Sequence, residues 1–285
     1  MSSVQIVYEI HVAVLDIEIQ DRRRRGYRTA SRRLRPFLTL VIFPQVGLVM
    51  ASCLSADCPD WRTIAALLYT AITRADGQLQ GGIPDEISVH KSAEVFVSHL
   101  QDFCSNLGVT LRLSTSEHPT QKEGERLIGR LMRMTDERLL AYMGVQPAWN
   151  RSESPTPTLQ DLEDVFKQSL TDYHSSSNSE TGQSPPTFWQ KHCFPRRAVP
   201  HRLAVLLSRG VGRTIVSAGI RYGQQCYWDD QLAFFQPGTR VLIYPTPSLS
   251  IPRSVEVYHQ NRWVCTAEHR GGECRGGGHA EIYPS

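Results

Sequence analysis

The sequence lacks any long apolar run, and no stretch approaches the roughly 18 residues that a membrane-spanning helix requires. Its first residues have no basic start before an apolar block, so we expect no secretory signal. The seven cysteines are scattered, and no second pair joins Cys53 and Cys58 at a zinc-binding spacing. Together these absences favour reduced thiols in a soluble cytoplasmic protein that does not enter membranes.

The sequence also has little net charge, and a value of +3 is too small to indicate a nucleic-acid partner by itself. The distribution is more informative, because residues 22–35 contain eight arginines and no acidic residue. Such a run can neutralise phosphates and release counterions, although a solvated loop between strands is the alternative. The arginines that we expect to contact DNA are Arg22, Arg23, Arg24, Arg25, Arg28, Arg32, Arg33 and Arg35.

Residues 1–145 combine strand-like and helical patterns. We expect a long strand over residues 4–19, an arginine-rich loop, and a hairpin formed by two short apolar runs. Helical spacing then alternates with short apolar segments. This order predicts an α/β fold, a ribonuclease-H-like mixed sheet with flanking helices. The hairpin strands are expected at residues 37–42 and 48–53, later strands at 86–89 and 109–113, and helices at 61–72, 93–107 and 120–143.

The remaining residues have a different texture. We expect residues 146–200 to form a linker and a helix, at 159–173, that completes the core. Short β runs broken by glycine and proline fill residues 201–270 and predict a small all-β barrel domain. Residues 271–285 are glycine-rich and are expected to form a flexible tail.

Several short motifs stand in a recognisable order along the first half of the chain. Glu9-Ile10-His11 lies on the first expected strand, and Asp16 follows five residues after His11. Residues 35–39 (RPFLT) fit the pattern R-P-x-L-T, and residues 90–95 (HKSAEV) open the second expected helix. The third expected helix carries the pair Glu125-Arg126, preceded by Pro119 and Gly124.

Further motifs follow in the second half. Tyr173-His174 precedes residues 181–185 (TGQSP) and Trp189, and the β runs include residues 219–222 (GIRY) and Tyr227-Trp228. Taken together in this order, from about Ile6 to His269, the chain resembles the DDE transposases of the Mu and Tn7 type. The last segments resemble the β-barrel that follows the integrase-like core in Mu-type members.

This resemblance implies a role in DNA transposition and integration. It also implies a site in which two aspartates and a glutamate hold Mg²⁺ for polynucleotidyl transfer. His11 and His90 stand at the two aspartate positions, Glu125 is retained, and Asp16 matches an accessory position. A carboxylate can bridge two Mg²⁺ ions, whereas a neutral imidazole has one available lone pair and prefers transition metals. We therefore expect that Mg²⁺ is not bound and that transposase activity is lost.

Two explanations of the histidines remain open. His11, His90 and Glu125 could hold Zn²⁺ or Mn²⁺ and make the chain a metal-dependent hydrolase. Alternatively, selection on the site has relaxed. Relaxation is favoured because Phe43 and Ser92 replace an aspartate and a glycine of the family pattern, whereas a newly selected metal site would keep its supporting residues.

The sequence thus predicts a transposase-derived, integrase-like protein that binds DNA and is catalytically impaired. Its DNA surface would comprise the arginine-rich segment, Arg196, Arg197, Arg202 and the barrel. The helix-turn-helix modules that read transposon ends are not evident in the sequence. The alternative is a non-catalytic assembly partner or inhibitor of an active transposase, in which case other transposase subunits are partners.

Overall fold

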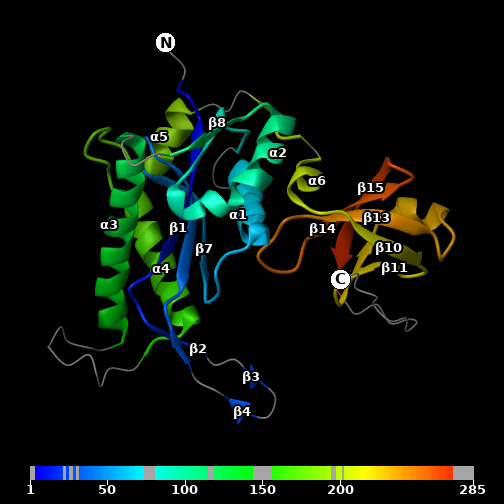
Figure 1. The fold of residues 1–285 in the computed structure, drawn as a ribbon, viewed down its shortest axis with the longest axis horizontal. Coiled ribbons are helices and arrows are strands. Elements are labelled where there is room, and N and C mark those ends of the chain that lie inside the picture. Colours follow the sequence, from blue (N-terminus) through cyan, green and yellow to red (C-terminus); the bar gives the residue numbers. More distant parts are fainter. Residues whose placement is uncertain are drawn as a thin grey trace. The chain divides into compact units, whose positions relative to one another are not determined.

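The structure, a computed structural model, describes residues 4–21, 24–25, 28–29, 32–73, 81–114, 119–143, 156–193, 197–200 and 202–271. The chain divides into two compact units, Met1–Val199 and Pro200–Ser285 (Figure 1). Residues 146–155 of the expected linker, and residues 272–285 of the expected tail, lie outside the described residues. Each unit is described by itself below.

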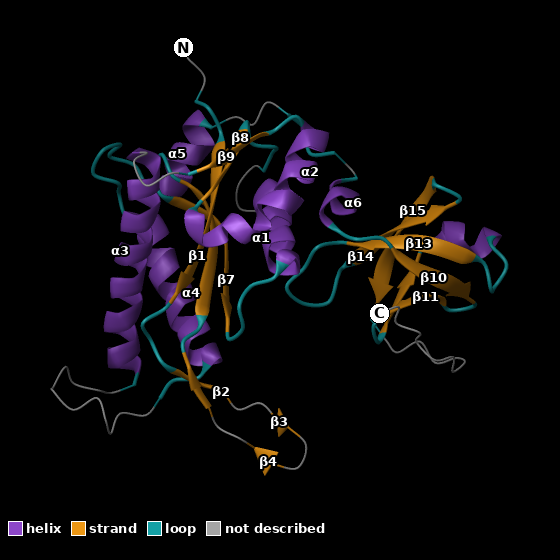
Figure 2. Cartoon of the chain, viewed as in Figure 1, coloured by secondary structure: helices purple, strands orange, loops and turns teal. Residues whose placement is uncertain are grey.

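A five-stranded mixed sheet forms the centre of the first unit (Figure 2). Its strand order is β7-β6-β1-β8-β9. β1 pairs antiparallel with β6, and β6 with β7, whereas β8 runs parallel to β1 and β9 parallel to β8. The strands are β1 (Val7–Val14), β6 (Phe37–Phe43), β7 (Leu48–Ser55), β8 (Glu86–Val89) and β9 (Thr110–Leu113).

Helices flank this sheet, and local sequence signals set several of their ends. Asp60 begins α1 because its Oδ1 accepts from the Thr63 N–H at 3.0 Å. Gly108 ends α2 with a positive φ of 62°, which glycine adopts without strain. Thr158 and Asp161 form a reciprocal capping box at the start of α4. The helices are α1 (Trp61–Thr73), the 3₁₀ helix η1 (Lys91–Phe96), α2 (Val97–Leu107), α3 (Pro119–Tyr142), α4 (Leu159–Ser175) and α5 (Pro185–His192).

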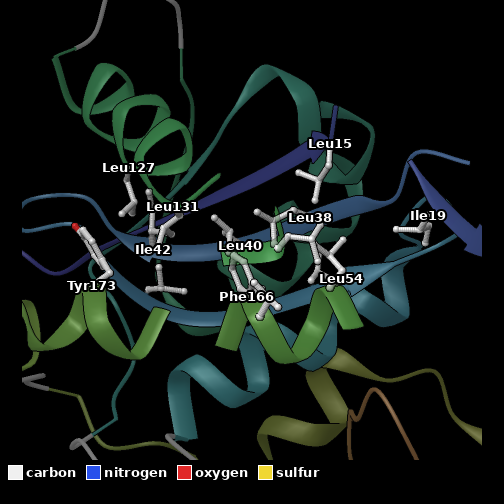
Figure 3. Packing of buried hydrophobic residues seen from close by; sticks show 14 residues of the cluster. Leu15, Ile19, Leu38, Leu40, Ile42, Leu54, Leu127, Leu131, Phe166 and Tyr173 are labelled. Atoms are coloured by element: carbon white, nitrogen blue, oxygen red, sulfur yellow. The ribbon is translucent and has the colours of Figure 1, made fainter. Parts of the chain in front are cut away.

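One hydrophobic cluster fixes α3 and α4 against the sheet. Leu127 and Leu131 from α3, with Phe166 from α4, pack onto Leu40 and Ile42 of β6 (Figure 3). These side chains are at most 4% exposed. Since burial of each large apolar side chain contributes about 1.5–3 kcal/mol, this cluster holds the first half of α3, including Gly124 and Glu125, at a defined place over β1 and β6.

The second unit contains a closed barrel with the order β10-β11-β12-β15-β14-β13. Alternate residues, including Ile215, Ile243, Val255 and Val257, point into its core. The predicted fold class, a ribonuclease-H-like mixed α/β sheet followed by a small all-β barrel, is therefore confirmed. The elements are α6 (Leu203–Leu207), β10 (Val211–Val216), β11 (Gly219–Tyr222), β12 (Gln225–Trp228), the 3₁₀ helix η2 (Asp230–Phe234), β13 (Arg240–Pro245), β14 (Ser254–His259) and β15 (Arg262–Arg270).

Two local predictions about the first 35 residues were wrong. The single long strand over residues 4–19 is divided, because β1 ends at Val14 opposite Phe37, the first residue of β6. The arginine-rich segment is not simply a loop. It contains the short antiparallel pairs β3 (Arg24–Arg25) with β4 (Arg28–Thr29), and β2 (Ile19–Asp21) with β5 (Arg32–Leu34).

The expectation of reduced thiols throughout also needs one correction. Five cysteines of the described ranges are free, and three of them, Cys104, Cys193 and Cys265, are buried. Burial raises the pKa of Cys193 to about 12, so this thiol stays protonated and unreactive. Cys226, however, is disulfide-bonded. No helix among the described residues is long and apolar enough to span a membrane.

Candidate functional site

The three residues predicted from the sequence lie together at one end of the sheet. Because β1 and β8 are parallel neighbours with Ile10 opposite Val89, the residues that follow, His11 and His90, are also neighbours. Their rings stack, with centroids 4.7 Å apart and planes at 22°. His90 Nε2 lies 3.4 Å from Glu125 Oε1 on α3.

A fourth residue, Glu9, belongs to this group and was missed by the sequence reasoning. His11 Nε2 lies 3.0 Å from Glu9 Oε1, and both side chains are almost fully buried, at 2% and 1% exposure. The two atoms are close but not aligned for a hydrogen bond. Residues two apart on a strand share a face, so the pair could have been found from the sequence.

Helix α3 covers the His11 imidazole through Gly124. A Cβ built on Gly124 would lie 2.5 Å from His11 Nε2 and 3.1 Å from Ile42 Cδ1. Only glycine allows the helix backbone to approach this closely. His11 is therefore 1% exposed, enclosed between β1, β6 and α3. The position at which the family pattern expects a metal-binding aspartate holds a buried packing residue.

His90 has a more open position and a structural role at the start of η1. Its Nδ1 accepts from the Ser92 backbone N–H at 3.2 Å and lies 2.7 Å from Ser92 Oγ. Ser92 Oγ in turn accepts from the Val12 N–H, which ties η1 to β1. Burial lowers the pKa of His90, the nearby His11 lowers it further, and Glu125 opposes both effects. The neutral imidazole, with Nδ1 as acceptor and Nε2–H directed at Glu125, is favoured.

This arrangement does not fit a two-Mg²⁺ site. The lone pair of an imidazole lies in the ring plane, so the nitrogens of two stacked rings direct their lone pairs within nearly parallel planes, which do not meet at one nearby point. Glu9 is buried against His11, which leaves Glu125 as the accessible carboxylate of the four residues. Within the described ranges, no group of three or more His, Cys, Asp or Glu side chains is placed to hold a metal ion. The predicted His11-His90-Glu125 metal site stays a prediction.

The arginine-rich segment is described in part. Arg33 lies 3.7 Å from Glu18, and Arg35 lies 3.3 Å from Asp16, in exposed pairs that are weak in water. Asp16, the expected accessory residue, has a side chain that is 92% exposed. Arg24, Arg25, Arg28 and Arg32 lie on the short strands, with side chains outside the description, and Arg22 and Arg23 lie outside the described residues.

Arg197 has a structural role that the sequence did not suggest. Its Nη1 donates to the carbonyl oxygens of Leu107 and Gly108 at 2.8 and 2.9 Å, and its Nη2 donates to that of Pro84. The guanidinium thus satisfies carbonyls at the end of α2 and fastens the segment after α5 to the core. Three of the five guanidinium N–H groups are used in these bonds, and the expectation that Arg197 contacts DNA stays a prediction. Arg196 lies outside the described residues.

The Tyr173-His174 motif supports the β6–β7 turn. His174 Nε2 accepts from the Val49 N–H at 3.2 Å, and Tyr173 packs over Gly47, whose positive φ of 70° and lack of a side chain permit the contact. Arg130 lies over the Tyr173 ring at 5.2 Å, beside a pocket of about 140 Å³. The role of His174, which the motif alone did not explain, is to accept a backbone hydrogen bond.

The fold and the site define an α/β unit in which His11, His90, Glu9 and Glu125 lie together, followed by a barrel. No family model and no curated protein sequence matches the chain. Among solved structures, the catalytic core domain of BIV integrase is similar, with 14% identity over 65% of this chain and 94% of that one, and a TM-score of 0.39. The simian T-cell lymphotropic virus intasome, in complex with PP2A regulatory subunit B56 gamma, has 10% identity over 93% of this chain and 77% of that one, with a TM-score of 0.37.

Proposed function

We propose that the chain is a transposase-derived, integrase-like DNA-binding protein of the transposition and integration class that has lost polynucleotidyl transfer. The proposed loss of catalysis rests on one observation. The residue at the first aspartate position, His11, is 1% exposed beneath Gly124 and beside the buried Glu9. A DNA phosphate and a hydrated Mg²⁺ ion cannot reach a side chain that is enclosed in this way.

The site chemistry supports the same conclusion. Phosphoryl transfer with two metal ions needs anionic oxygen ligands that bridge the ions and offset their charge. Glu125 supplies one carboxylate, whereas His11 and His90 supply neutral nitrogens that stack on each other. His90 is also used as a helix cap through Ser92. Each histidine thus stabilises the fold at the place where the family pattern expects a ligand.

DNA binding is proposed from the arginines. The eight arginines of residues 22–35 and the arginine-rich barrel supply cationic groups that can pair with phosphates. The test is the salt dependence of affinity for a fluorescent DNA duplex, with the wild type compared to a variant in which all eight arginines become glutamine. We expect weaker binding and a shallower slope of log K against log salt in the variant. An unchanged affinity and slope would show that this segment does not contact DNA.

The enclosed site also favours a second candidate function, a non-catalytic subunit that joins or inhibits an active transposase. Such a subunit needs the fold in order to assemble with the enzyme, but it does not need a metal site. The distinguishing measurement is co-purification with an active transposase and its effect on strand transfer. Binding of DNA without any effect on that enzyme supports the first candidate, and inhibition by mixed assembly supports the second.

A further inference from the structure

The outer face of the barrel carries an exposed tryptophan whose ring is held in place. Trp263, on β15, is 43% exposed, yet its Nε1 donates to Glu256 Oε2 at 2.7 Å. Glu256 is only 6% exposed and also accepts from the Thr266 hydroxyl at 3.1 Å. A buried carboxylate that accepts hydrogen bonds from two side chains therefore fixes the orientation of an indole that is partly open to solvent.

Trp263 belongs to a row of side chains across three strands. Leu242 pairs with Tyr258, and Tyr258 pairs with Trp263, so the three side chains lie on one face of the sheet. Val257, which precedes Tyr258 on β14, points into the core. A register shift after Val257 places Trp263 opposite Tyr258, although the buried Cys265 is only two residues further on. The row therefore faces outward, and Tyr258 contributes a second aromatic ring beside the tryptophan.

The described part of the second unit is positively charged. Between residues 200 and 271 the sequence has eight arginines, no lysine and four acidic residues, which gives these residues a net charge of +4. One of those acids, Glu256, is already engaged with Trp263. Arg202 lies over the Tyr258 ring at 6.0 Å. Arginine suits this setting because it pairs with phosphate and stacks on flat rings.

We propose that this face, formed by Arg202, Tyr258 and Trp263, binds single-stranded nucleic acid. An unpaired base stacks on the open face of Trp263, and Arg202 pairs with a flanking phosphate. In a duplex both faces of each internal base are covered by its neighbours, so a fixed indole has no base surface to meet. The exposed ring therefore favours a single-stranded ligand, whereas positive charge alone would suit single-stranded and double-stranded DNA equally.

This inference deepens the proposed DNA-binding function and rests on it. Glu256 acts as a positioning residue, because it holds the indole without facing the ligand. Pre-organisation of the ring reduces the entropy lost on binding. The surface differs from the arginine-rich segment of residues 22–35, which would contact duplex phosphates, so the two can be tested separately in the full chain.

The experiment compares Trp263→Phe with Trp263→Leu. Both variants lose the bond to Glu256 and keep an apolar side chain, but only phenylalanine keeps a flat ring. Fluorescence anisotropy measures the affinity for a single-stranded oligo-dT and for a blunt duplex of equal length, with circular dichroism confirming the fold. We expect Trp263→Leu to weaken oligo-dT binding about tenfold or more, Trp263→Phe to retain most of it, and duplex affinity to stay unchanged in both.

Three results would overturn the inference. If both variants bind oligo-dT as tightly as the wild type, the base does not stack on Trp263. In that case, binding of the duplex by the wild type would still support the proposed DNA-binding function. Equal losses for oligo-dT and the duplex would show a general electrostatic or structural effect. Absence of binding to either form would remove the proposed function as well. The variant Glu256→Ala removes the acceptor for the indole N–H, and we expect it to weaken oligo-dT binding less than Trp263→Leu does while leaving duplex binding unaffected.

Discussion

His11 and Gly124 are matched to each other. The imidazole Nε2 of His11 occupies the space next to α3 in which any side chain at position 124 would begin, 2.5 Å from a Cβ built there. The contact joins β1 to α3 at the point where the family pattern would place a catalytic aspartate and its glutamate. It therefore couples His11 to the packing of the helix that carries Glu125.

The first prediction concerns this contact. Gly124→Ala should lower the free energy of unfolding by about 1–3 kcal/mol, because the added methyl group overlaps a buried ring that cannot move away. Gly129→Ala is the matched control in the same helix. It has no atom within 4 Å of its Cβ position, so it should raise stability by about 1 kcal/mol through helix propensity.

The measurement is chemical denaturation of the two variants and of the double variant Gly124→Ala/His11→Ala. Removal of the imidazole should restore part of the stability lost at position 124, which a double-mutant cycle reports as a coupling energy. If Gly124→Ala behaves like Gly129→Ala, the close approach of α3 to His11 does not exist.

A second prediction concerns the buried pair of Glu9 and His11. His11→Leu leaves the Glu9 carboxylate buried without its neighbour and should destabilise the protein by about 3–5 kcal/mol. The double variant Glu9→Leu/His11→Leu removes both polar groups and should recover most of that loss. Thermal unfolding at pH 7 measures both. Equal destabilisation of the single and double variants would contradict a paired role for the two residues.

A third prediction is a dependence of stability on pH through His90. Its pKa is lowered in the fold by burial and by His11, against the influence of Glu125 and Glu9. The unfolded chain therefore takes up a proton first as the pH falls below the ordinary value of about 6.5. The stabilisation is complete above that pH and is lost progressively from there down to the lowered pKa of the folded state.

The matched variant is His90→Asn, which keeps a side-chain acceptor for the Ser92 N–H and does not titrate. Unfolding temperatures measured from pH 7.5 to pH 5 should fall more steeply for the wild type than for this variant. Parallel curves would mean that protonation of His90 is not linked to folding.

A fourth prediction separates structural arginines from DNA-binding ones. Arg197→Ala should lower the free energy of unfolding by about 1–3 kcal/mol, because three backbone carbonyls lose their donor. Its DNA affinity, measured under conditions in which it is folded, should fall less than that of Arg33→Gln/Arg35→Gln, because three of the five N–H groups of Arg197 are already used. Arg33→Gln/Arg35→Gln should show the reverse pattern, with weaker DNA binding and little change in stability. A DNA-binding defect in Arg197→Ala as large as that of the double variant would contradict the assignment.

Much of the fold was readable from the sequence because its signals are local. The strand β8 (Glu86–Val89) was predicted with its observed ends, and Asp60 and Gly108 were identified as helix-terminating residues from their types alone. The end of β1 was not predictable in this way. It depends on β6, more than 20 residues later, which begins at Phe37; the preceding Pro36 accepts from the Leu15 N–H but has no N–H with which to continue the pairing.

The site was readable only in part. The motif order brought His11, His90 and Glu125 together, as the structure has them. The contact of Gly124 with His11 could not be predicted, since it depends on how α3 docks through Leu127 and Leu131. The engagement of Arg197 with three carbonyls is likewise a tertiary property, which charge patterning cannot reveal.

The most direct test of the central claim is a combined assay of DNA binding and DNA cleavage by the purified full chain in Mg²⁺, Mn²⁺ or Zn²⁺. The variant His11→Asp/His90→Asp is assayed beside the wild type. We predict salt-sensitive DNA binding with no nicking or strand transfer by either protein, because position 11 stays enclosed by Gly124 and Glu9. Metal-dependent nicking by the wild type that disappears in His11→Ala would contradict the account, and so would a gain of activity in the double variant.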